Sequence, residues 1–141
     1  MPTWIIFAIL SALFASLVAI FGKIGISQVD STLATTVRAV IMAAFLVIVS
    51  LGLDKAKLLN TISARPFLFI VLSGIAGALS WLCYFFALKS GPVGGVVALD
   101  RLSVVFAVVL AFLFLSEELT WKTGLGTVLV TGGAILLSLP K

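Results

Sequence analysis

The chain has 141 residues, of which 62% are hydrophobic and 10% are charged. A soluble domain is usually about 45–50% apolar and about 25% charged, so this composition is typical of a membrane protein. The chain has no His and one Cys, which argues against an enzyme, a metal site, a disulfide or a bound cofactor. The net charge of +4 comes from basic residues at the ends of apolar runs, so we expect no nucleic-acid partner.

Five apolar runs have the length of about 20 residues that a membrane-spanning helix needs. They cover residues of about 4–22, 33–53, 67–88, 96–115 and 123–139. We therefore predict an all-α integral membrane protein with five spans in one domain over residues 1–141. The first run could also be a signal peptide, but no basic side chain precedes it, and we expect it to be a span of the mature protein.

Residues between the runs predict where the helices begin and end. Asp30 and Ser31 are typical of a cap at the start of the second helix. Pro66 precedes the third run, where a proline in the first helical turn loses no hydrogen bond. Gly91 and Pro92 interrupt the chain after the third run and are candidates for a turn or a hinge.

The turn before the fifth run contains one acid of interest, Glu117. At the end of the fourth helix a negative charge is unfavourable, because helix C-termini prefer cations. A charge solvated in the turn is therefore one interpretation of Glu117.

The basic residues set the orientation of the chain only weakly. Five spans place the two termini on opposite sides of the bilayer. The side of the N-terminus then has Lys55, Lys57, Arg65 and Lys122; the other side has Lys23, Lys89 and Lys141, and also Arg38 and Arg101 if these are counted. The positive-inside rule needs an excess on one side, and almost none is present. We therefore expect insertion in both orientations and an antiparallel homodimer, the two-chain equivalent of an inverted-repeat transporter of ten helices.

Three polar or aromatic residues inside the runs fall at one depth. At 1.5 Å per residue, Arg38 lies about 12 Å past Asp30, and Asp100 lies about 12 Å past Pro92. Trp81 lies about 10 Å before the end of the third run, on the same side of the bilayer. The sequence therefore predicts that Arg38, Trp81 and Asp100 lie at one level.

Two interpretations of this level are open. In the first, it is a hydrated substrate pocket in which cations bind an anionic group and Trp81 and Tyr84 pack against the apolar part of the cargo. The candidate cations are Lys23, Arg38 and Arg101, and their excess over Asp100 favours a carboxylate or a zwitterion. In the second, Arg38 and Asp100 form a structural ion pair. We favour the pocket, because charged residues inside a membrane are costly and usually functional.

Small residues recur at spacings of three and four in two of the runs. The first run has Ala8, Ala12, Ala15, Ser16 and Ala19, and the third has Ser73, Gly74, Gly77, Ala78 and Ser80. Such stripes let helix backbones approach closely. We expect them to pack within the protomer, with a dimer interface as the alternative. Gly124, Gly126, Gly132 and Gly133 of the fifth run allow either interpretation, whereas Gly91 and Gly95 indicate a hinge or a helix break.

Several motifs, in this order, resemble the EamA domain of the drug/metabolite transporter superfamily. They are Phe21 to Ile26, Val29 to Thr35 with Arg38, Trp81 to Phe85, Lys89 to Pro92, Leu99 to Val105, and Glu117 to Lys122. The resemblance covers essentially the whole chain. Glu117 resembles an acid at this turn of the family, which implies that it caps the fifth helix, with Thr120 or a gating contact as partner. The chain departs from the family where it has Arg101, since Lys is frequent there, and where it has Ser116 and Glu118 in place of Gly and Arg. Long family members fuse two such units in opposite orientation, so the resemblance also implies an antiparallel pair, and it implies metabolite or amino-acid-like cargo.

We therefore expect a multi-pass protein of the cell (inner) membrane that acts as a secondary transporter. Its partners would be the lipid bilayer, a second copy of the chain and a small-molecule substrate, amino-acid-like or with a carboxylate. Two alternatives stay open: a flippase for a lipid-linked anionic headgroup, and a non-transporting membrane subunit. A pure scaffold gains little from charges inside the membrane, which favours transport.

Overall fold

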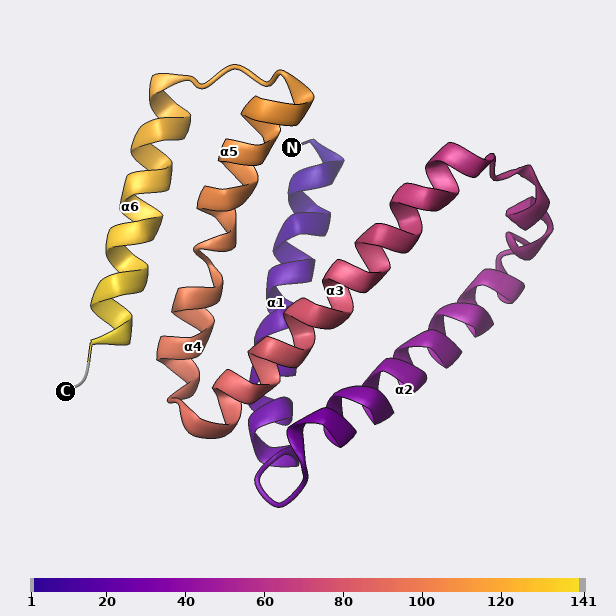
Figure 1. Cartoon of the computed structure of the whole chain (residues 1–141), viewed down its shortest axis with the longest axis horizontal. Coiled ribbons are helices and arrows are strands. Elements are labelled where there is room, and N and C mark those ends of the chain that lie inside the picture. The colour runs from indigo at the N-terminus through magenta and orange to yellow at the C-terminus, as the bar shows by residue number, and fades with distance from the viewer. Residues whose placement is uncertain (1, 140–141) are drawn as a thin grey trace. The chain divides into compact units, whose positions relative to one another are not determined.

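The computed structural model describes residues 2–139. Six α-helices and one short 3₁₀ helix follow one another, and no strand occurs within residues 2–139 (Figure 1). The elements are α1 (Thr3–Gly25), α2 (Ser31–Gly52), η1 (Ala56–Thr61), α3 (Ala64–Ser90), α4 (Val93–Asp100), α5 (Ser103–Leu115) and α6 (Trp121–Ser138). The prediction of an all-α protein is confirmed.

Four segments of the described chain are long and apolar enough to cross a membrane. They are α1, α2, α3 and Val93–Leu115, the last of which contains both α4 and α5. The helix α6 is not among them, because its 18 residues begin with Trp121 and Lys122 and include glycines and threonines. Four predicted spans therefore coincide with apolar helices, and the fifth stays a prediction.

The chain divides into two compact units. One contains Gly22–Lys89, which is the end of α1 with α2, η1 and α3. The other contains α1 up to Phe21 together with α4, α5 and α6. In the first unit α2 and α3 run in opposite directions and are connected through η1 (Figure 1).

The start of α2 is capped as predicted. The carboxylate of Asp30 accepts hydrogen bonds from the N–H groups of Thr32 at 2.9 Å and Leu33 at 3.1 Å. The bond from Leu33, followed by that from Thr32, holds the pKa of the Asp30 carboxyl below its ordinary value. In α3, which begins at Ala64, Pro66 lies in the first turn, where its missing N–H leaves no helical bond unmade.

The fourth predicted span is not one continuous helix, which corrects our expectation for residues 96–115. The N–H of Arg101 donates to the carbonyl of Ala98 at 3.1 Å, and that of Leu102 donates to Leu99 at 2.9 Å. These bonds join residues three apart, as in a 3₁₀ turn, instead of four apart. A turn therefore separates α4 from α5 and places Asp100 at the end of a helix.

Small residues bring α4 against α6 in the second unit. Gly95, Ala98 and Ala134 are buried. A Cβ atom on Gly95 would lie 3.6 Å from the Cα of Ser138 and 3.7 Å from the carbonyl oxygen of Leu137. Gly95 is therefore a packing position inside α4, and our assignment of it to a hinge or break is wrong. The break itself lies at Gly91 and Pro92, between α3 and α4, as predicted.

The cap of α6 is Thr120, not Glu117. The Thr120 hydroxyl oxygen accepts the N–H of Thr123 at 3.2 Å. Glu117 is exposed in the connection before the helix, as the alternative of a solvated turn charge expects. Its proposed gating role stays a prediction.

Ser116 ends α5 in the left-handed conformation, with φ 56° and ψ 30°. This conformation costs a residue with a Cβ about 1–2 kcal/mol, a cost that glycine avoids. We expect Ser116→Gly to raise the melting temperature of the purified protein, because the side chain is exposed and the strain is relieved. Ser103→Gly, at the first residue of α5, should not raise it, because Ser103 lies outside the left-handed region. An unchanged or lower value for Ser116→Gly would contradict the strain at this turn.

Candidate functional site

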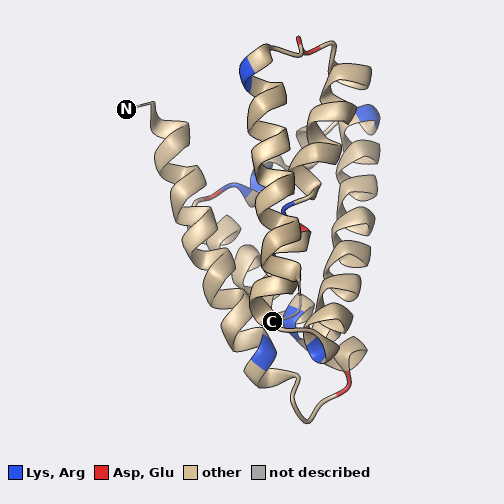
Figure 2. Ribbon diagram, turned by 90° about the vertical axis from the view of Figure 1, so that its left-hand side faces the viewer, with Lys and Arg blue, Asp and Glu red and all other residues tan. Residues whose placement is uncertain are grey.

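The charged residues of the described chain lie at helix ends and in connections, with one exception (Figure 2). Arg38 lies inside α2, about two turns past Ser31. Every other Lys, Arg, Asp or Glu within residues 2–139 lies in a connection or within about one turn of the end of an α-helix. Arg38 is therefore the charge that most needs an explanation.

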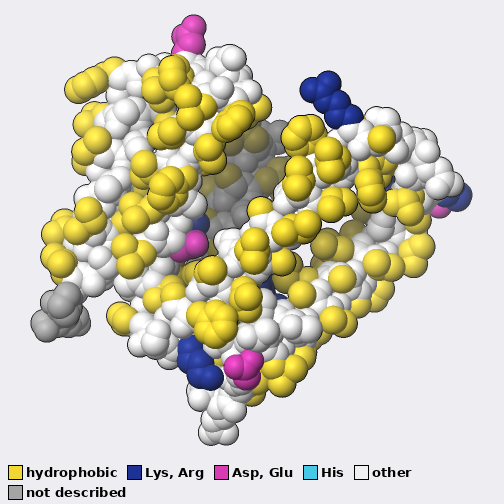
Figure 3. Space-filling view, in the orientation of Figure 1, with side chains coloured by type: hydrophobic (Ala, Val, Ile, Leu, Met, Phe, Trp, Pro, Cys, Tyr) yellow, Lys and Arg dark blue, Asp and Glu magenta, His cyan; other side chains and the backbone are white. Residues whose placement is uncertain are grey.

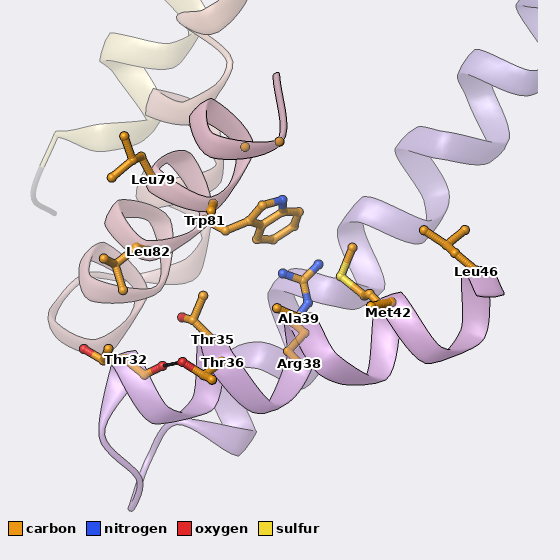
Figure 4. Close-up of a pocket in the computed structure, with 14 residues that line it drawn as sticks. Thr32, Thr35, Thr36, Arg38, Ala39, Met42, Leu46, Leu79, Trp81 and Leu82 are labelled. Atoms are coloured by element: carbon orange, nitrogen blue, oxygen red, sulfur yellow. Dashed lines mark hydrogen bonds between the residues drawn. The ribbon is translucent and has the colours of Figure 1, made fainter. Parts of the chain in front are cut away.

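Arg38 of α2 stacks on Trp81 of α3. The guanidinium carbon lies 3.5 Å from the centroid of the Trp81 ring, and 5.4 Å from that of Phe85. Figure 4 shows the two side chains pointing toward one another from the two helices. A cation over an indole face is attracted by the ring quadrupole, more strongly where water is excluded. The shared depth expected for Arg38 and Trp81 agrees with this contact.

Aromatic side chains hold Trp81 in place. Tyr84 meets it edge-on with ring centroids 5.5 Å apart, and Phe85 meets it with centroids 6.0 Å apart. Phe85 is buried, whereas Trp81 and Tyr84 are half-buried. Tyr84 thus packs on Trp81, so in this arrangement it supports the indole. Its predicted contact with cargo stays a prediction.

A groove of about 730 Å³ runs between α2 and α3. It is hollow in the space-filling view, with hydrophobic side chains along it (Figure 3). Its lining is apolar except for threonines and Arg38, and no acidic residue is among the described residues that form it. The lining residues are Thr32, Thr35, Thr36, Arg38, Ala39, Met42, Ala43, Leu46, Gly74, Gly77, Ala78, Leu79, Trp81 and Leu82.

The threonines at one end of the groove present acceptors. The Thr35 hydroxyl donates to the carbonyl of Ser31 at 2.7 Å, and the Thr36 hydroxyl donates to Thr32 at 2.9 Å (Figure 4). Since each hydroxyl has one proton, these oxygens can accept but not donate a further bond. Among the side chains that line the groove, Arg38 therefore supplies the charged N–H donors to an anion, beside the neutral indole N–H of Trp81.

The small residues of α3 line this groove instead of making a close helix contact. A Cβ atom on Gly74 or Gly77 would meet nothing within 4 Å. These two glycines therefore make no close helix contact inside this unit, and packing of the stripe elsewhere in the protomer stays a prediction. The glycines of α6, Gly124, Gly126, Gly132 and Gly133, are open in the same way.

Lys23 has a structural contact at the end of α3. Its ammonium donates to the carbonyl of Leu88 and, at 3.4 Å, to that of Lys89. A cation is favourable there, because the last carbonyls of a helix have no intrahelical donor. The Lys89 ammonium in turn donates to the carbonyl of Val29 at 3.1 Å. The predicted anion-binding role of Lys23 stays a prediction.

Asp100 and Arg101 belong to the other unit, at the turn between α4 and α5. Both are exposed there. The expected ion pair of Arg38 with Asp100, and the role of Arg101 in binding, would join the two units and stay predictions. The structure thus brings together Arg38, Trp81 and Tyr84 in one unit.

Sequence reasoning missed most of the groove lining, including Met42, and it missed the contact of Gly22 with Phe85. Met42 lies one turn past Arg38 on the same face of α2, a spacing that could have identified it. Gly22 faces Phe85: a Cβ atom there would lie 3.1 Å from Phe85 Cζ and 3.8 Å from Leu88 Cδ1. No sequence pattern predicts this close contact between Gly22 and Phe85.

We expect Gly22→Ala to be less stable than Gly25→Ala by about 1–3 kcal/mol, because its Cβ atom overpacks against the buried Phe85. Gly25→Ala is the matched control, because it lies in the same last turn of α1 and its Cβ would meet nothing within 4 Å. The measurement is the melting temperature of both variants in detergent. Equal melting temperatures would show that the Phe85 ring can shift to make room for the new methyl group without a loss of stability.

Comparison with known proteins shows the family of the chain. Residues 2–139 match the model of the EamA-like transporter family. The chain is also 38% identical over 136 residues, or 96% of each chain, to a Sinorhizobium sp protein named as an uncharacterized transporter in the cobO 3' region. No solved structure matches the chain significantly. The chain therefore belongs to the EamA-like transporter family, as its motifs predicted.

Proposed function

We propose that this protein is a secondary transporter of small metabolites that contain a carboxylate, including amino-acid-like ones. One observation supports this most: the guanidinium of Arg38 lies 3.5 Å over Trp81, in a groove with no acidic lining residue among those described. One face of a stacked guanidinium is covered, while its N–H edge stays available. That edge matches the two oxygens of a carboxylate, which it can bind through paired hydrogen bonds.

The transporter would be an antiparallel homodimer in the cell (inner) membrane. The near balance of basic residues on the two sides supports dual insertion. In this arrangement α6 supplies the fifth span, and each protomer supplies one Arg38 and one Trp81. Asp100 and Arg101 would add to the same pathway, with Gly91 and Pro92 as the hinge between α3 and α4.

A thermal-shift screen of the purified protein tests the substrate class. The compounds are amino acids, simple carboxylates and cationic drugs, since a ligand that binds the folded state stabilises it by about 2.7 kcal/mol at a hundred times its Kd. We expect carboxylates to raise the melting temperature and cationic drugs to leave it unchanged. Stabilisation by cationic drugs alone would contradict the proposal.

Uptake into proteoliposomes distinguishes a transporter from a non-transporting subunit. Carboxylates that stabilise the wild type should enter vesicles with the wild type faster than vesicles without protein. Arg38→Gln should lose this uptake, whereas Arg65→Gln, at the exposed start of α3, should keep it. Binding without any uptake would favour the subunit alternative.

A further inference from the structure

We propose that the groove between α2 and α3 selects cargo by the length of an unbranched apolar chain, with the carboxylate on Arg38 and the chain along Gly74 and Gly77. The occupant is a free amphipathic carboxylate. This inference rests on the proposed carboxylate site. It adds that the groove also recognises the apolar chain of the cargo.

The two ends of the groove differ in chemistry on either side of Arg38. Toward the start of α2 it has the threonines, and toward the other end it has Met42, Ala43 and Leu46. From Arg38 to Leu46 the α2 wall extends about 12 Å at 1.5 Å per residue. A chain anchored at Arg38 therefore has an apolar wall along several of its methylene groups.

The opposite wall is formed by the face of α3 that contains Trp81. Gly77 lies one turn before Trp81, and Gly74 lies about one turn before Gly77. A Cβ atom on either glycine would meet nothing within 4 Å, so no helix packing in this unit uses their small size. Their lack of side chains leaves room beside Met42 and Leu46, and this room admits a slender alkyl chain.

Charge determines which end of the cargo binds where. Arg38 is the charged residue of the lining, and no acidic residue neutralises it among the described residues that form the groove. A cargo with an anionic end and an apolar end is thus complementary to the groove. A polar cargo of the same charge would leave the apolar half unused.

The experiment measures the affinity of the detergent-purified protein for butanoate, hexanoate, octanoate and decanoate by thermal shift. Each added methylene that enters the apolar groove should tighten binding about fourfold. Gly77→Ala and Gly77→Leu should progressively remove the gain for octanoate and decanoate while butanoate binds as before. Gly126→Leu is the matched control, because its Cβ is equally open but lies on α6, outside the groove, and it should keep the full gain.

The outcomes separate this inference from the carboxylate site itself. Equal affinity for all four acids, or a chain-length gain that survives Gly77→Leu, would overturn the groove and leave the anion site standing. If none of the four acids binds, this inference is overturned, and if the screen of amino acids and simple carboxylates also finds no ligand, the carboxylate site is overturned as well. Loss of binding when dioleoylphosphatidylglycerol is added would show that a lipid occupies the groove. A change of oligomeric state in Gly77→Leu would show that a second copy does, and either result overturns the inference.

Discussion

Replacing Arg38 with Lys should weaken carboxylate binding about tenfold to a hundredfold, because a hydrogen bond to a charged group is worth about 1.5–3 kcal/mol. The lysine keeps the positive charge but loses the planar fork that binds two oxygens and the flat face that stacks on Trp81. Binding should therefore fall further than stability. Both quantities can be measured on one preparation, by titration calorimetry and by thermal melting.

Arg65→Lys is the control for this exchange, since Arg65 is exposed near the start of α3. It should leave both affinity and melting temperature unchanged. Trp81→Ala should weaken the binding of cargo with an apolar group most, because it removes part of the apolar lining of the groove as well as the surface on which Arg38 lies. If Arg38→Lys lowered the melting temperature without changing affinity, the stack would be structural only.

Reporters fused to the C-terminus should be active on both sides of the membrane. We expect activity on both sides because the basic residues are almost equally divided between the two sides of the predicted topology. The measurement compares a reporter that works only inside the cell with one that works only outside it. Activity on one side alone would exclude an antiparallel dimer of this chain.

A charge-shifted variant is the control for the topology. Asn60→Lys with Thr61→Lys adds two basic residues at the exposed end of η1, in the connection between α2 and α3. This excess should restrict the reporters to one orientation and abolish uptake, because no oppositely oriented partner remains. Uptake that survives would show that a protomer, or a parallel pair, is sufficient.

Local chemistry made part of the fold predictable. Asp30 has a carboxylate that the first turn of a helix needs, and Pro92 cannot continue the helix that ends at Ser90. The level of Arg38 and Trp81 could also be predicted, because α2 begins close to where α3 ends, as the contact of Lys89 with Val29 shows, and every helical residue rises by the same amount. These inferences need only local side-chain chemistry and the geometry of a single helix.

The rest depends on contacts between segments far apart in sequence. The turn at Arg101 and Leu102 contains no proline or glycine. The sequence therefore does not indicate that the backbone hydrogen bonds there join residues three apart. Whether Gly77 faces a neighbour or open space is likewise decided by the separation of α2 and α3. Small residues at similar spacings therefore have different surroundings: Gly95 lies in a close helix contact, whereas Gly77 lines a groove.

The most direct test of the account is a binding cycle with two ligands and two proteins. The ligands are the carboxylate that most stabilises the wild type in the screen and its uncharged primary amide; the proteins are the wild type and Arg38→Gln. We predict that the wild type binds the carboxylate about tenfold to a hundredfold more tightly than the amide. Arg38→Gln should bind the two ligands equally, because changing the ligand and changing Arg38 each remove the same interaction, that of the guanidinium with the carboxylate. Equal preference for the carboxylate in both proteins would show that Arg38 does not bind it.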